Sequence, residues 1–410
     1  MASDAIVVGG GVAGLVAARR LALGGRRVVL LERSDHLGGQ VVALPIAGVD
    51  LDAAAESYAT RGGAVAALAA ELGLGDDLVT PTPAPAWLHR ADGTAVPLPA
   101  TGVLGIPGHP LAPDVVRAIG RPAALRAWAD RLLPRRRGAD AASLDDLVRA
   151  RMGAGVADGL VAPIVRGVHS KEPRDLTVDT ASPRLRAELA ARGSLAGAVR
   201  ALRAQAPAGS QVGGIRGGMH RLVTALARDA ERLGVDIRTG VDIGRVTADA
   251  VEADGERLVG TVVRAFAEPA DDQRRLTLVT LVLEAPALDA APRGTGLLVA
   301  AGAPGIRARA LTHLTAKWAW VAEALPGRHA VRLSYDGDPA DPVGQATRDA
   351  ATLLGVRIDS VLDSAVRTWD RGVRTPDDDI VSVGEGAAGT GLASVVAQAE
   401  RTAAEVLTAG

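Results

Sequence analysis

The N-terminal segment carries the feature that most restricts what this chain can fold into. A short apolar stretch leads into Gly9, Gly11 and Gly14, spaced as G-x-G-x-x-G, and apolar residues then continue at helical spacing. In such a turn the first glycine allows a tight bend, the second lets a pyrophosphate approach the backbone, and the third lets the helix pack closely on the strand. A second apolar stretch ends at Glu32, whose carboxylate can accept hydrogen bonds from both ribose hydroxyls. This order predicts a βαβ unit that binds a dinucleotide.

The composition excludes several classes of function. The 46 Lys and Arg against 47 Asp and Glu leave a formal net charge of -1, so there is no basic field for nucleic acid. The chain has no cysteine, which excludes disulfides, thiolate metal sites and flavin attachment through sulfur. No two of the seven histidines have a spacing, with a carboxylate, that suggests a metal site. Redox chemistry here would therefore need a cofactor.

The sequence predicts neither a signal peptide nor a membrane span. Residues 5–18 are interrupted by glycines, and no stretch reaches the roughly 20 apolar residues that a spanning helix needs. We expect a cytoplasmic protein, with peripheral contact to a membrane and the oligomeric state left open. Arg131 and residues 135–137 form a basic cluster that is either solvated or faces anionic lipid or substrate.

Periodicity along the chain predicts helices, strands and loops in a mixed order. Helical spacing covers residues 62–73, 219–233 and most of 114–206. Strand alternation covers residues 276–283, 309–321 and 329–335, with a hairpin over 86–98 that turns at Asp92 and Gly93. The proline-rich residues 97–113 are expected to be loop. A strand at 380–383, a glycine loop and a helix to 407 repeat the pattern of the N-terminus.

A second glycine motif follows the acidic residue. Residues 32–39 read E-R-S-D-H-L-G-G, in which Gly38 and Gly39 let the chain fold back under a pyrophosphate and Arg33 adds positive charge. The alternative is an ordinary surface turn. This motif resembles that of the amine-oxidase-like flavoproteins, which bind FAD.

Further segments narrow the resemblance to the protoporphyrinogen and coproporphyrinogen III oxidase family, closest to its actinobacterial, coproporphyrin-forming members. They follow the family's order along nearly the whole chain and lie at residues 52–57, 71–74, 96–99, 101–107, 167–173, 214–219 and 311–318. The resemblance implies non-covalent FAD held by Gly9, Gly10, Gly11, Val12, Ala13, Gly14, Glu32, Arg33, Gly38, Gly39, Gln40, Ala54, Ala55, Glu56, Ser57, Ile243, Thr390, Gly391 and Leu392.

The same resemblance implies an α/β fold, α+β overall, with a Rossmann-type FAD-binding domain beside an antiparallel substrate sheet and a helical lobe. We assign the discontinuous FAD-binding domain to residues 1–85, 207–270 and 365–410. The substrate-binding sheet takes residues 86–113 and 271–364, and the helical lobe takes residues 114–206.

The resemblance implies oxidation of coproporphyrinogen III to coproporphyrin III in haem biosynthesis, with O2 as acceptor, H2O2 released and a ferrochelatase as downstream partner. The flavin N5 would take the hydride, and no side chain is assigned as catalytic. Arg61 is a candidate for the substrate's carboxylates, or a solvated residue. Trp318 and Trp320 are expected on one face of a strand and Lys317 on the other, where the rings wall the substrate or pack in the core. His169 and His313 are expected to be structural.

Alternatives remain open at this point. They are protoporphyrinogen IX as substrate, another amine-oxidase-like activity, and a homologue that binds flavin without turnover. The chain departs from the family in having Gln40 where a basic or aromatic residue is common and Ala54 where a glycine lets the backbone approach the cofactor. It is also shorter between Trp369 and Ile380, where relatives carry a helix beside the flavin. These departures bear on FAD affinity and on rate.

Overall fold

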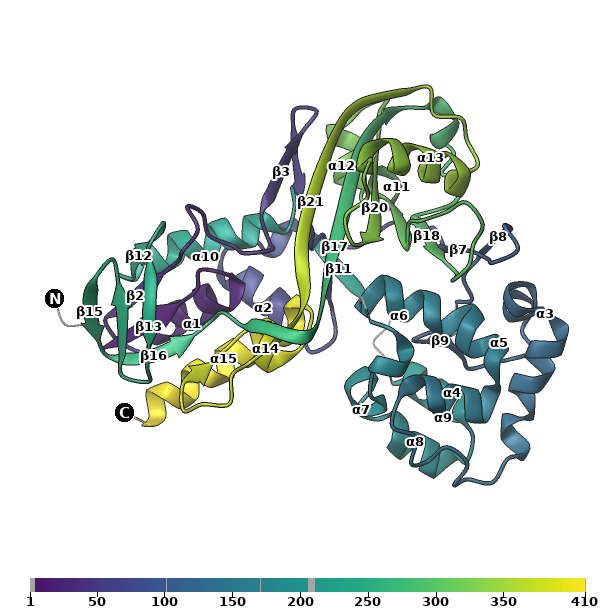
Figure 1. The fold of residues 1–410 in the computed structure, drawn as a ribbon, viewed down its shortest axis with the longest axis horizontal. Helices are drawn as coiled ribbons and strands as arrows, with labels where there is room; N and C mark the ends of the chain where they lie inside the picture. Colours follow the sequence, from purple (N-terminus) through teal and green to yellow (C-terminus); the bar gives the residue numbers. More distant parts are fainter. Residues whose placement is uncertain (1–3, 101, 170, 206–210, 410) are drawn as a thin grey trace. The chain divides into compact units, whose positions relative to one another are not determined.

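The computed structural model describes residues 4–100, 102–169, 171–205 and 211–409, and the chain divides into two compact units. The first unit comprises Met1–Pro81, Gly209–Arg274 and Asp370–Gly410, and the second comprises Thr82–Ala208 and Arg275–Trp369. The colours of Figure 1 show that both units combine separated stretches of sequence. Thr101 and Ser170, which belong to the family-like segments, lie outside the described residues.

The first unit is built on a parallel sheet whose central strands are apolar on both faces. The strand order is β12-β2-β1-β16-β22, and each neighbouring pair is parallel. Helices cover one face of this sheet, and the antiparallel strands β13, β14 and β15 cover the other. Because both faces are covered, the parallel strands are apolar throughout and do not alternate with polar residues. The bounds are β1 Ala5–Val8, β2 Val28–Leu31, β12 Asp236–Arg238, β13 Ile243–Val246, β14 Ala250–Ala253, β15 Glu256–Val259, β16 Thr261–Arg264 and β22 Val381–Ser382.

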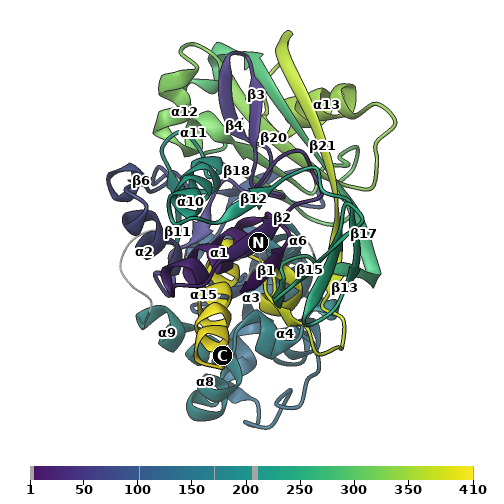
Figure 2. The ribbon, with the colours of Figure 1, turned by 90° about the vertical axis from the view of Figure 1, so that its left-hand side faces the viewer.

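The two ends of the chain pack together in this unit. Helices α1 and α15 lie side by side in Figures 1 and 2, and their apolar residues share one cluster with α2 and α10. The bounds of the helices are α1 Val12–Leu23, α2 Ala64–Glu71, α10 His220–Arg232, α14 Glu385–Ala388 and α15 Leu392–Ala409. Shorter paired strands are β3 Ala43–Ile46, β4 Val49–Asp52, β5 Tyr58–Ala59, β6 Leu78–Val79 and β11 Val212–Ile215.

The second unit contains a mostly antiparallel sheet in the order β21-β17-β20-β19-β18-β7-β8. Its inward-facing residues form a cluster with α13, so one face of the sheet is covered by that helix. The bounds are β7 Trp87–His89, β8 Ala95–Pro97, β17 Glu268–Glu284, β18 Gly296–Val299, β19 Ala310–His313, α11 Leu314–Lys317, α12 Ala319–Ala324, β20 His329–Asp336, α13 Pro342–Leu354 and β21 Ser360–Arg374.

Helices with a separate apolar cluster make up the rest of the second unit. Gly120, with φ of 81° and ψ of 158°, breaks the first of them, and Pro122 follows that break. The bounds are β9 Gly102–Val103, β10 Ile106–Pro107, α3 Pro113–Trp128, the 3-10 helix η2 Ala129–Leu132, α4 Leu144–Met152, α5 Ala154–Val156, α6 Ala162–His169, α7 Val178–Ala181, α8 Leu185–Arg192 and α9 Leu195–Ala204.

The structure confirms most of the predicted elements and corrects two. The hairpin over 86–98 and the strands over 276–283 and 329–335 are present. The expected strand over 309–321 is wrong beyond His313, because short helices follow. The expected loop over 97–113 contains the paired strands β9 and β10. In the part of the chain that the structure describes, no helix is long and apolar enough to cross a bilayer.

Candidate functional site: a glycine-lined cofactor cradle

The first glycine motif has a separate structural reason for each glycine. Gly9 follows β1 with φ of 112°, a conformation that favours glycine. A Cβ on Gly14 would lie 1.9 Å from the Gly9 carbonyl oxygen, so only glycine lets α1 begin this close to the strand. A Cβ on Gly11 would meet nothing within 4 Å, so the space at the N-terminus of α1 is open. An anionic group fits this space, because helix N-termini favour negative charge.

The second glycine motif lies directly against the first. The Gly38 amide donates to the Gly10 carbonyl oxygen at 2.9 Å, and Gly38 forms a bridge with Gly11. Gly39 has φ of 60°, and a Cβ there would lie 3.7 Å from the Gly11 Cα. The two motifs are separated along the sequence but adjacent in space, so they line one cradle around Gly11.

Glu32 presents its carboxylate to this cradle. Oε2 accepts from the Gly10 amide at 2.6 Å and Oε1 from the Ser34 amide at 2.8 Å. The Glu32 carbonyl oxygen accepts from the Val241 amide at 3.0 Å. This bond brings the start of β13, with the half-buried Ile243, toward the end of the sheet where Glu32 lies. The carboxylate is thus an acceptor beside the glycine turn, where ribose hydroxyls can compete for it.

The C-terminal glycine loop reaches the first turn of α1. A Cβ on Gly384 would lie 3.5 Å from the Ala13 Cβ, next to the buried Val12. Thr390 and Gly391 are exposed, and Leu392 begins α15. The start of α15 therefore offers backbone amides on the exposed side of the C-terminal loop.

The remaining candidate contacts differ in exposure. Residues 54–57, which follow β4, are all half-buried, whereas Arg33 and Gln40 are exposed. The preceding Asp52 is buried and accepts from the backbone amides of Met219 at 2.9 Å and His220 at 3.0 Å. Asp52 thereby fixes the loop that leads to Ala54, Ala55, Glu56 and Ser57 against the start of α10.

Arg264 is a residue of this neighbourhood that the sequence reasoning missed. It ends β16 at 3% exposure, and its Nη2 donates to Asp378 Oδ2 at 2.6 Å. Among the described residues its Nη1 has no hydrogen-bond partner. A Cβ on Gly9 would lie 3.0 Å from the carbonyl oxygen of Ala265, the residue that follows Arg264. The incompletely satisfied guanidinium therefore belongs to the residue next to one that approaches the glycine turn. An arginine ending an otherwise apolar strand, T-V-V-R, was the signal available.

Arg61 lines a cavity of about 390 Å³ in the first unit. Arg401 and Gln398 of α15 also line it, together with small residues of the glycine loop and of α2. The lining of the cavity therefore has two arginines that could bind a carboxylate and, among the described residues, no large apolar side chain.

Lys317 and Trp318 were expected on opposite faces of a strand, and this expectation is wrong. Lys317 ends α11 and Trp318 separates it from α12, because the chain leaves the sheet after His313. The Lys317 Nζ lies 5.3 Å from the Trp318 ring centroid, in cation–π contact. Trp318 is 2% exposed and Trp320 is half-buried. The position of Trp318 is that of a packed core residue.

His313 is buried in the second unit, as a structural histidine would be. Its Nε2 lies 3.2 Å from His329 Nδ1, and His329 Nε2 lies 3.0 Å from Asp289 Oδ1. Burial, reinforced by the His329 imidazole, lowers the pKa of His313 to about 4. His313 is therefore neutral in the folded protein at neutral pH. The side chain of His169 lies outside the described part of the chain.

This shift predicts a loss of stability in mild acid. The pKa of His313 rises to the ordinary value near 6.5 on unfolding, so the unfolded chain binds the proton more tightly. The free energy of unfolding is therefore unaffected by this group above about pH 6.5 and falls by about 3 kcal/mol as the pH drops toward 4. His313→Asn should flatten the dependence of urea unfolding on pH in this window. Equal profiles for the wild type and His313→Asn would contradict the assignment.

Similarity to known proteins extends over most of the chain. The family model described as "Flavin containing amine oxidoreductase" matches residues 12–271. The coproporphyrinogen III oxidase of Mycobacterium tuberculosis (strain ATCC 25618 / H37Rv) is 30% identical over 395 residues, covering 88% of this chain and 85% of its own. That of Propionibacterium freudenreichii subsp. freudenreichii is 26% identical over 409 residues, covering 87% and 76%.

Solved structures share the fold over the whole chain. The Exiguobacterium sp. 255-15 structure named "Putative protoporphyrinogen oxidase" has a TM-score of 0.82 at 21% identity and covers 99% of both chains. Putrescine oxidase bound to putrescine has a TM-score of 0.69 at 17% identity and covers 100% and 99%. The expected amine-oxidase-like fold is thereby confirmed.

Proposed function

Because this chain belongs to the flavin-containing amine oxidoreductase family, we propose that it binds FAD non-covalently and oxidises coproporphyrinogen III to coproporphyrin III. The acceptor is O2, which is reduced to H2O2. The observation that carries the FAD proposal is the meeting of Gly11, Gly38 and Glu32 in one cradle. The substrate proposal rests on the extent of the similarity to coproporphyrinogen III oxidases, which spans most of the chain.

The residues of the cradle have distinct tasks in this proposal. FAD, when bound, supplies the hydride acceptor that the side chains lack. The open space at Gly11 takes the pyrophosphate and Glu32 takes the ribose hydroxyls. Residues 54–57 and Thr390, Gly391 and Leu392 would hold the flavin end, where the N-terminus of α15 favours negative charge. Arg33, Gln40 and Ile243 complete the proposed contacts.

Anaerobic reduction tests the function directly. The yellow protein, mixed with coproporphyrinogen III without O2, should lose its flavin absorbance and regain it when O2 is admitted. Putrescine, offered as an amine substrate, should leave the absorbance unchanged. Bleaching by putrescine alone would assign amine oxidation instead, and no bleaching by any porphyrinogen would identify a homologue without turnover.

Glu32→Lys should abolish most FAD binding. The substitution removes the carboxylate that would accept hydrogen bonds from the ribose hydroxyls, and the lysine ammonium cannot accept them. We expect at least a tenfold fall in bound flavin, measured as the ratio of absorbance at 450 nm to 280 nm, roughly equal to a loss of 1.4 kcal/mol or more. Asp35→Lys makes the same charge change at an exposed position of the same loop and should keep its flavin. Normal flavin content in Glu32→Lys would contradict the placement of the ribose.

Arg61→Gln tests the proposed carboxylate contact. The guanidinium lines a cationic cavity, so its loss should raise KM for coproporphyrinogen III more than it lowers kcat. We expect a rise of about tenfold, the size of one lost charged hydrogen bond. Arg117→Gln, on the exposed surface of α3, is the control and should leave KM unchanged. Equal steady-state constants for wild type and Arg61→Gln would remove Arg61 from the site.

A further inference from the structure

A second cavity, of about 510 Å³, lies entirely within the helical part of the second unit. We call it the lobe cavity, and it is lined by Gly108, His109, Pro110, Leu111, Ala112, Trp128, Arg131, Ser194, Ala196 and Arg200. Its volume is in the range of small-molecule sites. None of these residues belongs to the proposed flavin or substrate contacts.

The lining of the lobe cavity is cationic without counter-ions. It includes the guanidinium groups of Arg131 and Arg200, and no carboxylate among the described residues lines it. Several other arginines of this unit are paired with carboxylates, as Arg166 is with Glu172 at 2.7 Å. Within the described part of the chain, neither Arg131 nor Arg200 has such a partner. A cavity with this lining attracts an anion.

The two arginines are held in place by neutral groups. The Arg131 guanidinium carbon lies 4.2 Å from the Trp128 ring centroid, which orients the planar group while leaving its N–H donors available. Arg200 Nη1 donates to the Gly108 carbonyl oxygen at 2.8 Å, which leaves further donors on the guanidinium. Both side chains can therefore bind an anion without first breaking an ion pair.

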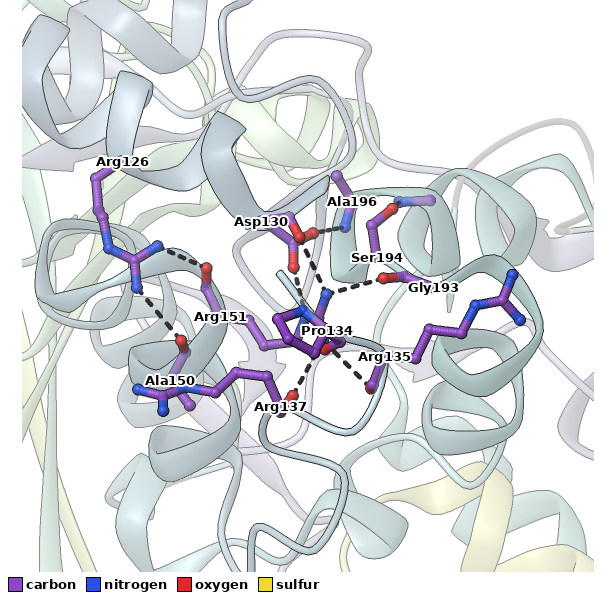
Figure 3. A network of polar contacts seen from close by, with 11 residues as sticks. Arg126, Asp130, Pro134, Arg135, Arg137, Ala150, Arg151, Gly193, Ser194 and Ala196 are labelled. Atoms are coloured by element: carbon purple, nitrogen blue, oxygen red, sulfur yellow. Dashed lines mark hydrogen bonds and ion pairs between the residues drawn. The ribbon is translucent and has the colours of Figure 1, made fainter. Parts of the chain in front are cut away.

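A buried ion pair between Asp130 and Arg151 joins two segments that line the lobe cavity, and Figure 3 shows its hydrogen bonds. Asp130 precedes Arg131 and accepts from the Ala196 amide at 3.0 Å, and Arg131 and Ala196 both line the cavity. The fully buried Arg151 donates to Asp130 Oδ1 and to the Gly193 carbonyl oxygen, at 2.5 and 2.9 Å. The Ala196 amide at the N-terminus of α9 is already bound to Asp130, so it is not available to an anion in the cavity. The positive charge of the lobe cavity therefore comes from the arginine side chains.

The remaining lining is apolar. Pro110, Ala112 and the Trp128 ring lie beside the cations, and Leu111 is 44% exposed. Inorganic anions would leave this surface in water, whereas an apolar chain or ring attached to the anion would cover it. We propose that the lobe cavity binds an amphipathic anion, a carboxylate or phosphate monoester attached to an apolar chain or ring.

Titration calorimetry with defined probes tests the proposal on the full chain. Decanoate and decyl phosphate, below their micelle concentrations, should bind one site at least tenfold more tightly than decan-1-ol or inorganic phosphate. Arg131→Gln and Arg200→Gln should each weaken decanoate binding about tenfold, as the loss of a charged hydrogen bond predicts. Arg136→Gln changes a neighbouring exposed arginine outside the lining and should bind as wild type does. Arg131→Lys keeps the charge but not the planar fork, so it should be intermediate.

Vesicles distinguish a free ligand from a lipid headgroup. Phosphatidylcholine vesicles with and without phosphatidylglycerol are sedimented with the protein. If the natural source is a lipid, sedimentation requires phosphatidylglycerol, depends on Arg131 and Arg200, and is reduced by decanoate; a free ligand gives no sedimentation. The proposal is overturned if decan-1-ol binds as tightly as decanoate, if Arg136→Gln weakens binding as much as the lining variants do, or if vesicles bind while free decanoate does not.

Discussion

Replacing Asp130 by alanine should lower the free energy of unfolding of the second unit by about 3–5 kcal/mol, because it leaves the Arg151 charge buried without its carboxylate. Both side chains are fully buried, and Arg151 Nε donates to Asp130 Oδ1 at 2.5 Å. The Arg151 guanidinium also donates to the carbonyl oxygens of Pro134 at 3.2 Å and Arg137 at 3.0 Å (Figure 3), so it ties the basic loop to α4. The change is measured by urea unfolding and by hydrogen exchange at residues 129–139.

Two control variants distinguish the cost of leaving a charge buried without its partner from the cost of losing side-chain contacts. Asp158→Asn breaks the exposed pair with Arg149 on the same helical part and should cost less than about 1 kcal/mol. Asp130→Leu combined with Arg151→Met removes both charges and should be less destabilising than Asp130→Ala alone. If Asp130→Ala costs no more than Asp158→Asn, the ion pair does not hold the basic loop in place.

This ion pair also shows where sequence reasoning stops. The sequence around Arg151 reads as an ordinary charged helix, and Arg135, Arg136 and Arg137 read as a basic cluster. The partners of Arg151 are carbonyl oxygens of loops and a carboxylate 21 residues away, which no local pattern encodes. The burial of an arginine depends on such long-range acceptors, so it could not be predicted from periodicity.

The first βαβ unit could be predicted because its constraints are local. Gly9 and Gly14 are required by backbone conformation within a few residues of the chain. Alternation likewise predicts β20 and the second half of β17, residues 276–283. The region after His313 failed because alternation in L-T-H-L-T-A-K-W-A-W does not distinguish a strand from two short helices. There the burial of Trp318 in the second unit, a tertiary effect, overrides local β propensity. The contacts proposed for FAD remain predictions.

The segment between Trp369 and Ile380 should make coproporphyrinogen III oxidation slow while FAD binding stays normal. The resemblance implies that relatives carry a longer segment here, with a helix beside the flavin. Here β21 runs to Arg374 and only residues 375–380 connect it to β22, with Asp378 held by Arg264 at 2.6 Å. We infer that a flavin bound in the cradle is less shielded from water and that the substrate is less firmly positioned. A barrier raised by about 3 kcal/mol would slow turnover roughly a hundredfold.

The measurement is kcat with FAD-saturated protein, beside the Mycobacterium tuberculosis relative under the same conditions. Replacing residues 375–379 by the relative's corresponding segment should raise kcat by at least tenfold without changing the flavin content. A glycine–serine insert of equal length is the matched control and should leave kcat low, because it adds chain without a packed helix. If the unaltered protein turns over as fast as the relative, the missing segment is dispensable. The cradle around Gly11 and the end of α15 would then position flavin and substrate well enough without it.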